Sequence, residues 1–128
     1  TDATPQRSNA HLIDAPILQA NLNQLIAQLK SESPWSQSDR NSVTVLKSDT
    51  MRIVLIGLHA SAELTAHKAP GTISVQVLQG KIEFATGNQR LVMGQGELLS
   101  LQENIVHSVK ALEESFFLLT MVIYKAKT

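Results

Sequence analysis

A histidine, a Pro-Gly turn signal and a β-rich run that ends in glycine stand together in one stretch, His67-Lys-Ala-Pro-Gly-Thr-Ile-Ser-Val-Gln-Val-Leu-Gln-Gly80. A second stretch reverses this order, because it opens on glycine and closes on histidine: Gly96-Glu-Leu-Leu-Ser-Leu-Gln-Glu-Asn-Ile-Val-His107. Apolar and β-branched residues between turn signals are typical of short strands. The two stretches together predict a small β-barrel with one interior shared by His67 and His107.

Short β-rich runs continue on both sides of these stretches. Turn signals such as Pro70-Gly71 and Gly87-Asn88 separate the runs. The connections are too short for the helices of βαβ units, so the pattern indicates an antiparallel sandwich or barrel. The predicted strands are 43–46, 51–58, 72–78, 81–85, 90–93, 97–101, 106–111 and 116–124.

The residues before the barrel have a different pattern. Residues 1–12 show no hydrophobic periodicity and predict a flexible tail. Residues 13–41 are assigned to an N-terminal helix and a connector, and residues 42–128 to the barrel domain. The helix is predicted over 18–30, with apolar residues at helical spacing: Leu18, Leu22, Leu25, Ile26 and Leu29.

The connector is predicted from Pro34 and the polar run 36–41, which should end the helix. Trp35 is expected to pack inside this connector. Two of the predicted strands, 53–58 and 116–123, are apolar at almost every position, which is typical of strands covered on both faces. The barrel interior would cover one face, and helix 18–30 or a second protomer would cover the other. We therefore expect a homodimer.

The composition limits the classes of partner. At 128 residues, with 43% hydrophobic and 17% charged residues, the chain is expected to form one globular domain. Eleven basic residues balance eleven acidic ones, so no net positive field favours a nucleic acid or an anionic membrane. No apolar run reaches the ~20 residues that span a bilayer, and the first ten residues are polar. These observations predict a cytoplasmic protein that binds neither nucleic acid nor membrane.

The first stretch resembles the first conserved motif of the cupin family, Gly-x5-His-x-His-x(3–4)-Glu-x6-Gly. His67 occupies the first histidine position and Gly80 the closing glycine, whereas Ser61 stands at the opening glycine. Ala69 stands at the second histidine position and Ile73 at the glutamate position. The resemblance covers about residues 43–124. It implies a mostly β protein with an antiparallel cupin-type β-barrel (jelly roll), here preceded by one N-terminal amphipathic helix.

The second stretch resembles the second cupin motif, Gly-x5-Pro-x-Gly-x2-His-x3-Asn. Gly96 and His107 have the spacing of that motif, while Gln102, Asn104 and Ala111 replace its proline, second glycine and asparagine. Asparagine tolerates the left-handed backbone conformation nearly as glycine does. We therefore expect Asn104 to make the turn that the family makes with glycine.

The resemblance implies a divalent metal, since cupins usually bind one through three histidines and a glutamate. Only His67 and His107 remain of those ligands, and the other two positions carry aliphatic side chains. Gln76 is expected to point outward by strand alternation, and His59 is expected at the surface, as is His11. We therefore expect no cofactor or a weakly bound divalent metal held by His67 and His107.

Three functions are compatible with these residues. The preferred hypothesis is a small-molecule-binding barrel with an incomplete metal site, in which the two histidines hold the polar end of an organic ligand. The first alternative is a metal-dependent enzyme of the dioxygenase or isomerase type, and the second is a sensor or accessory module that uses helix 18–30 as a partner surface. The predicted pocket residues are His67, His107, Val75, Val77, Phe84 and Met93.

Overall fold

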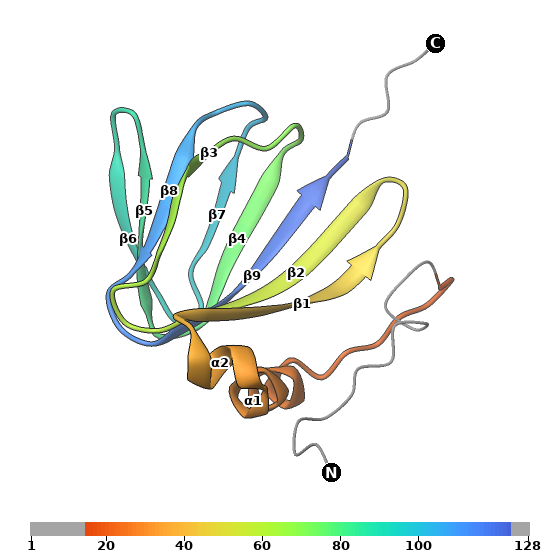
Figure 1. The fold of residues 1–128 in the computed structure, drawn as a ribbon. Helices are drawn as coiled ribbons and strands as arrows, with labels where there is room; N and C mark the ends of the chain where they lie inside the picture. Colours follow the sequence, from red (N-terminus) through yellow and green to blue (C-terminus); the bar gives the residue numbers. More distant parts are fainter. Residues whose placement is uncertain (1–14, 124–128) are drawn as a thin grey trace.

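The computed structural model describes residues 15–123 and places two short helices before a two-sheet β structure (Figure 1). The helices are α1 (Leu22–Ser31) and α2 (Ser33–Gln37). The strands are β1 (Arg40–Lys47), β2 (Met51–Leu58), β3 (Glu63–His67), β4 (Ile73–Gln79), β5 (Lys81–Thr86), β6 (Arg90–Gly94), β7 (Leu98–Leu101), β8 (His107–Ala111) and β9 (Ser115–Val122). No helix within the described residues is both long and apolar enough to span a lipid bilayer.

All the strand pairs are antiparallel. One sheet has the order β1-β2-β9-β4-β7 and the other the order β3-β8-β5-β6. Neighbours such as β2 and β9 are distant in sequence, so the chain crosses repeatedly between the sheets, as in a jelly roll. The prediction of a mostly β, antiparallel jelly-roll barrel is confirmed, with the helices beside β1 (Figure 1).

One strand of the barrel was not predicted. Strand β3 has the sequence Glu-Leu-Thr-Ala-His and lies mostly exposed, so it lacks the apolar run by which the other strands are recognised. It matters because His67 is its last residue. Strand β1 also begins at Arg40, inside the stretch expected to be the connector.

The helical region differs from the prediction of one helix over 18–30. Helix α1 begins only at Leu22, because the side chain of Asn21 accepts a hydrogen bond from the backbone N–H of Gln24 at 3.1 Å and caps the helix there. Pro34 does not act as a helix breaker. It lies in the first turn of α2, where its missing N–H leaves no helical hydrogen bond unmade. Part of the expected connector is therefore helical.

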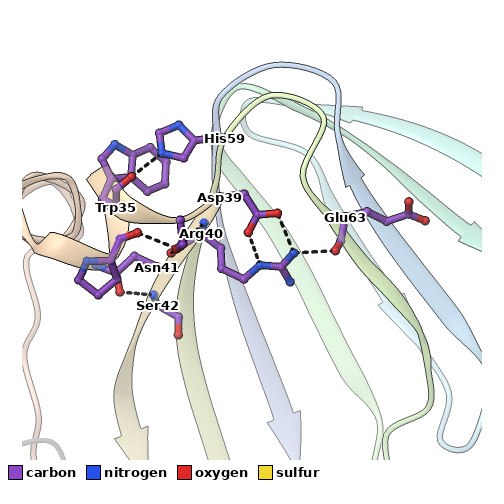
Figure 2. A network of polar contacts seen from close by, with 9 residues as sticks. Trp35, Asp39, Arg40, Asn41, Ser42, His59 and Glu63 are labelled. Atoms are coloured by element: carbon purple, nitrogen blue, oxygen red, sulfur yellow. Dashed lines mark hydrogen bonds and ion pairs between the residues drawn. The ribbon is translucent and has the colours of Figure 1, made fainter.

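Polar contacts and one aromatic stack join the helices to the barrel (Figure 2). Trp35 is buried, as expected, and stacks on His59 with ring centroids 3.7 Å apart, while Nε2 of His59 hydrogen-bonds to the Trp35 carbonyl oxygen at 2.7 Å. His59 is thus a half-buried packing residue, not the surface residue that was predicted. The buried amide of Asn41 donates to the Leu29 carbonyl oxygen at 3.1 Å and to Glu32 Oε1 at 2.9 Å. These bonds satisfy groups at the C-terminal end of α1.

Two apolar cores lie on opposite faces of the larger sheet. The barrel interior contains Leu58 of β2 and Phe117 of β9, whereas Leu55 and Phe116 of the same strands pack with α1 on the outer face. Strands β2 and β9 are therefore covered on both faces, and the helices supply the outer cover. A second protomer is therefore not needed to cover the outer face of these strands, because the helices of the same chain cover it. The homodimer stays a prediction. The predicted flexible tail at 1–12 and His11 lie outside the described residues.

The backbone keeps the turns of both motifs even where glycine is absent. The described residues with positive φ are Ser61 (74°), Gly80 (91°), Gly96 (86°) and Asn104 (61°). These are the glycine positions of the two cupin motifs to which the sequence was compared. The prediction that Asn104 adopts the left-handed conformation is confirmed, and Ser61 does the same at the opening position of the first motif.

Candidate functional site

A β-bulge places His67 opposite His107. Strand β3 pairs Leu64 with Val109 and then His67 with His107, so three residues of β3 span two residues of β8. The extra residue turns His67 onto the face that carries Leu64, which is the interior face of the smaller sheet. Without the bulge, alternation would point the His67 side chain away from the interior.

The two imidazoles form a pair, and each makes the same kind of hydrogen bond to the backbone two residues before it. Their ring centroids lie 4.4 Å apart, with the ring planes tilted by 59°. Nδ1 of His67 hydrogen-bonds to the Thr65 carbonyl oxygen at 2.8 Å, and Nδ1 of His107 to the Ile105 carbonyl oxygen at 2.9 Å. A carbonyl oxygen only accepts, so each neutral ring carries its proton on Nδ1 and presents the lone pair of Nε2. The site thus offers two neighbouring acceptor nitrogens.

The two histidines differ in exposure. His107 is 4% exposed, and its ring stacks on Phe84 with centroids 5.3 Å apart, whereas His67 is exposed at the end of β3. Burial lowers the pKa of the His107 imidazole below its ordinary value, the hydrogen bond to the Ile105 carbonyl opposes this effect, and the nearby His67 lowers the pKa slightly further. The environment therefore favours the neutral form of His107.

The other predicted pocket residues all lie in the core of the barrel interior. Val75 and Val77 are on β4, Phe84 is on β5 and Met93 is on β6, and none of these side chains is more than 4% exposed. Phe84 stacks on the His107 ring, and the other three side chains belong to the same apolar core. Contact of all four with a ligand stays a prediction.

A shallow hollow of about 190 Å³ adjoins His107 on the other side of its strand. Ser108 and Ala85 are register partners in β8 and β5. Each is next to a residue of the interior core, Val109 or Phe84, so the side chains of Ser108 and Ala85 point to the opposite face of the sheet. The hollow therefore lies on the outer face of the smaller sheet and does not belong to the barrel interior. Its lining residues are Ala66, Ala85, Thr86, Gly87, Val106, His107 and Ser108.

The donor set does not fit a metal centre with three or four protein ligands. Ile73 is 3% exposed within the apolar core, and Ala69 packs against the same core. Gln76 pairs with Leu98 and Leu118 on the outer face of β4, and His59 lies beside Trp35. Within residues 15–123 no three His, Cys, Asp or Glu side chains are grouped so as to hold a metal ion. Among residues 15–123, the two Nε2 atoms are the imidazole lone pairs that lie together at this place.

Sequence reasoning overlooked Arg52, which lies on the interior side of the larger sheet. Along β2, Ile53 and Leu55 face the helices while Ile56 and Leu58 face the interior, so alternation places Arg52 inside. Its register partner is Met121, which packs against the interior core. The available signal was a single arginine at the start of the otherwise apolar run 51–58.

Comparison with solved structures identifies the fold. A cupin-2 domain protein from Shewanella frigidimarina superposes with a TM-score of 0.66 at 14% identity, covering 81% of this chain and 94% of that one. An RmlC-like cupin from Desulfovibrio desulfuricans gives 0.60 at 26% identity, covering 65% and 81% of the two chains. The DMSP lyase DddQ from Ruegeria pomeroyi gives 0.61 at 15% identity, covering 71% and 50%. No protein-family model and no curated protein matches the sequence.

Proposed function

We propose that this protein, whose fold is that of the cupins, is a small-molecule-binding barrel that holds the polar end of an organic ligand between His67 and His107. The observation that carries the proposal is the pairing of two imidazoles whose Nδ1 atoms are engaged by backbone carbonyls, which leaves the two Nε2 lone pairs as neighbouring acceptors. A hydroxyl or amino group of the ligand would donate to these nitrogens.

The surroundings of the pair suit an organic molecule better than an ion. Phe84 stacks on His107, and the interior below is lined by aliphatic side chains at the positions where the cupin motif has metal ligands. Binding sites for small molecules combine an apolar lining with a few polar groups that fix orientation. The described residues supply both.

Metal-dependent catalysis is the second candidate, supported by the two adjacent Nε2 atoms and by the similarity in fold to an enzyme named as a DMSP lyase. The donor set described above leaves such a site with two protein ligands. The sensor hypothesis needs an open apolar face on the helix. Ile26 and Leu29 of α1 are instead buried against β1 and β2, which supports a structural role for the helix.

Metal content of tag-free protein, measured by inductively coupled plasma mass spectrometry, separates the first two candidates. The proposed function predicts substoichiometric metal in the wild type and in His67→Ala. Near-stoichiometric metal that is lost in His67→Ala would overturn it in favour of the metal enzyme.

Ligand binding is then tested by a thermal-shift screen of small neutral alcohols and amines with an apolar body. Compounds that raise the melting temperature should lose most of that effect in His107→Ala. The matched control is Ser108→Ala, because Ser108 is the next residue along β8 and points to the outer face. Equal shifts in wild type, His107→Ala and Ser108→Ala would contradict binding at the histidine pair.

A further inference from the structure

We propose that Arg52 is the anion-binding residue of this barrel and that the ligand is therefore a small hydroxy acid with an apolar body. The inference rests on the proposed function, since it names the class of molecule that the histidine pair would hold. Its evidence is independent of the histidines, because it comes from β2, in the other sheet.

Arg52 lies at the same end of the barrel as the histidine pair. In the larger sheet the register places four residues in one row across β2, β9, β4 and β7. In that order they are Arg52, Met121, Ile73 and Leu101. Ile73 is the first residue of β4, and the short loop 68–72 connects it to His67. Figure 1 shows the β1–β2 turn, the β3–β4 loop and the β7–β8 loop along the edge of the barrel away from the helices, with the end of β9 between the β1–β2 turn and the other two.

The guanidinium of Arg52 has a buried N–H donor without a hydrogen-bond acceptor. Its Nε is buried and makes no hydrogen bond, and it is the only buried side-chain nitrogen or oxygen among the described residues in that state. No ion pair within residues 15–123 involves Arg52. Three other cationic side chains in this range do form ion pairs with carboxylates: Lys30, Arg40 and Arg90. A buried donor on a permanently charged group is costly to leave unsatisfied. A carboxylate in the barrel would accept from Nε and a terminal nitrogen at once.

A second cation extends the row at its other end. Lys47 of β1 is the register partner of Arg52 and lies exposed at the rim. The end of β1 and the start of β2 therefore carry two cationic side chains as register neighbours.

The two sheets offer complementary groups. The smaller sheet offers hydrogen-bond acceptors at Nε2 of His67 and His107, and the larger sheet offers cationic donors. A ligand that satisfies both has a donor such as a hydroxyl and an anionic group such as a carboxylate. Met121, Ile73 and Leu101, which continue the row of Arg52, would contact the apolar body of such a ligand.

Mandelate and its primary amide, mandelamide, test the inference because they differ in the charge of one end. Calorimetric titration of the wild type should show the acid binding about tenfold or more tightly than the amide. Arg52→Met keeps much of the apolar stem and should reduce acid binding to the level of the amide while leaving the amide unchanged.

The control Lys110→Met removes an exposed cation from β8 and should leave both affinities unchanged. In the wild type, the Arg52 Nε–H resonance should shift on addition of mandelate, a readout that does not depend on a variant folding.

The outcomes separate this inference from the proposed function. If acid and amide bind equally and both lose affinity in His107→Ala, the histidine site stands and the anion assignment is overturned. If binding is unaffected by His107→Ala as well as by Arg52→Met, both fail. If neither probe binds at millimolar concentration and the Arg52 Nε–H resonance does not move, the hydroxy-acid assignment is overturned, and the neutral-ligand screen alone decides the proposed function.

Discussion

The backbone N–H of Asn104 donates to the carbonyl oxygen of Ala69 at 2.8 Å. This bond joins the loop that follows His67 to the loop that precedes His107. Asn104 has a φ of 61°, a conformation that few residues other than glycine and asparagine adopt without strain. The turn before the His107 strand is thereby hydrogen-bonded to the loop that follows the His67 strand.

Asn104→Val should destabilise the fold by about 1 to 3 kcal/mol, because a β-branched residue is strained at positive φ. Asn104→Gly should preserve stability to within about 1 kcal/mol, since glycine adopts this conformation readily. Urea denaturation followed by circular dichroism measures both. Gln102→Val, in the same loop, is the control. A value for Asn104→Val no larger than that of the control would contradict the role of the left-handed turn.

Gly80, which closes the first motif, should not tolerate a side chain. It has a φ of 91°, and a Cβ there would collide with the Glu114 carbonyl oxygen and lie 2.8 Å from the Ser115 Cα. We expect Gly80→Ala to cost at least about 2 kcal/mol. Gly87→Ala is a matched control, because a Cβ at Gly87 meets nothing within 4 Å. It should change the unfolding free energy by less than about 1 kcal/mol. Equal losses in the two variants would show that Gly80 is not sterically required.

The lowered pKa of His107 predicts a pH dependence of stability. The unfolded chain binds a proton at the ordinary histidine pKa, about 6.5, whereas the folded chain binds it only at lower pH. Between the two pKa values the unfolded state holds more protons, so the unfolding free energy falls as the pH drops through this window and levels off below the folded pKa. Urea denaturation across this range should show the loss in the wild type, and its His107 part should vanish in His107→Gln. An unchanged profile in the variant would assign the dependence to other groups.

Local sequence patterns were sufficient for most of the fold. Runs such as 81–85 and 90–93 became β5 and β6 with boundaries shifted by about one residue, because alternation and turn residues are local properties. Strand β3 was missed because its residues, Glu63 to His67, are held by pairing with β8 and not by burial of their own side chains. The start of α1 depended on a cap at Asn21, one polar residue in an otherwise helical pattern.

The site depended on facts that the sequence does not display. His67 and His107 were identified as a pair from motif spacing, but the bulge that brings them face to face appears only in the register of β3 and β8. Arg52 could not be placed inside the barrel until alternation along β2 was fixed by the positions of Leu55 and Leu58. A one-residue change of register reverses every such assignment.

The docking of α1 on the barrel supplies a last prediction. Leu29 is fully buried between α1 and β1, and Trp35, the single tryptophan, lies in the same core. Leu29→Ala should destabilise the protein by about 2 to 5 kcal/mol, because it leaves a cavity under the helix. The emission of Trp35 should shift to longer wavelength as the helices loosen from β1. Lys30→Ala is the control on the next residue, since its ion pair with Glu114 is solvent-exposed and should contribute less than about 1 kcal/mol. Unchanged Trp35 emission in Leu29→Ala, at a concentration of urea that leaves the barrel folded, would contradict the prediction that Leu29 holds the helices on β1.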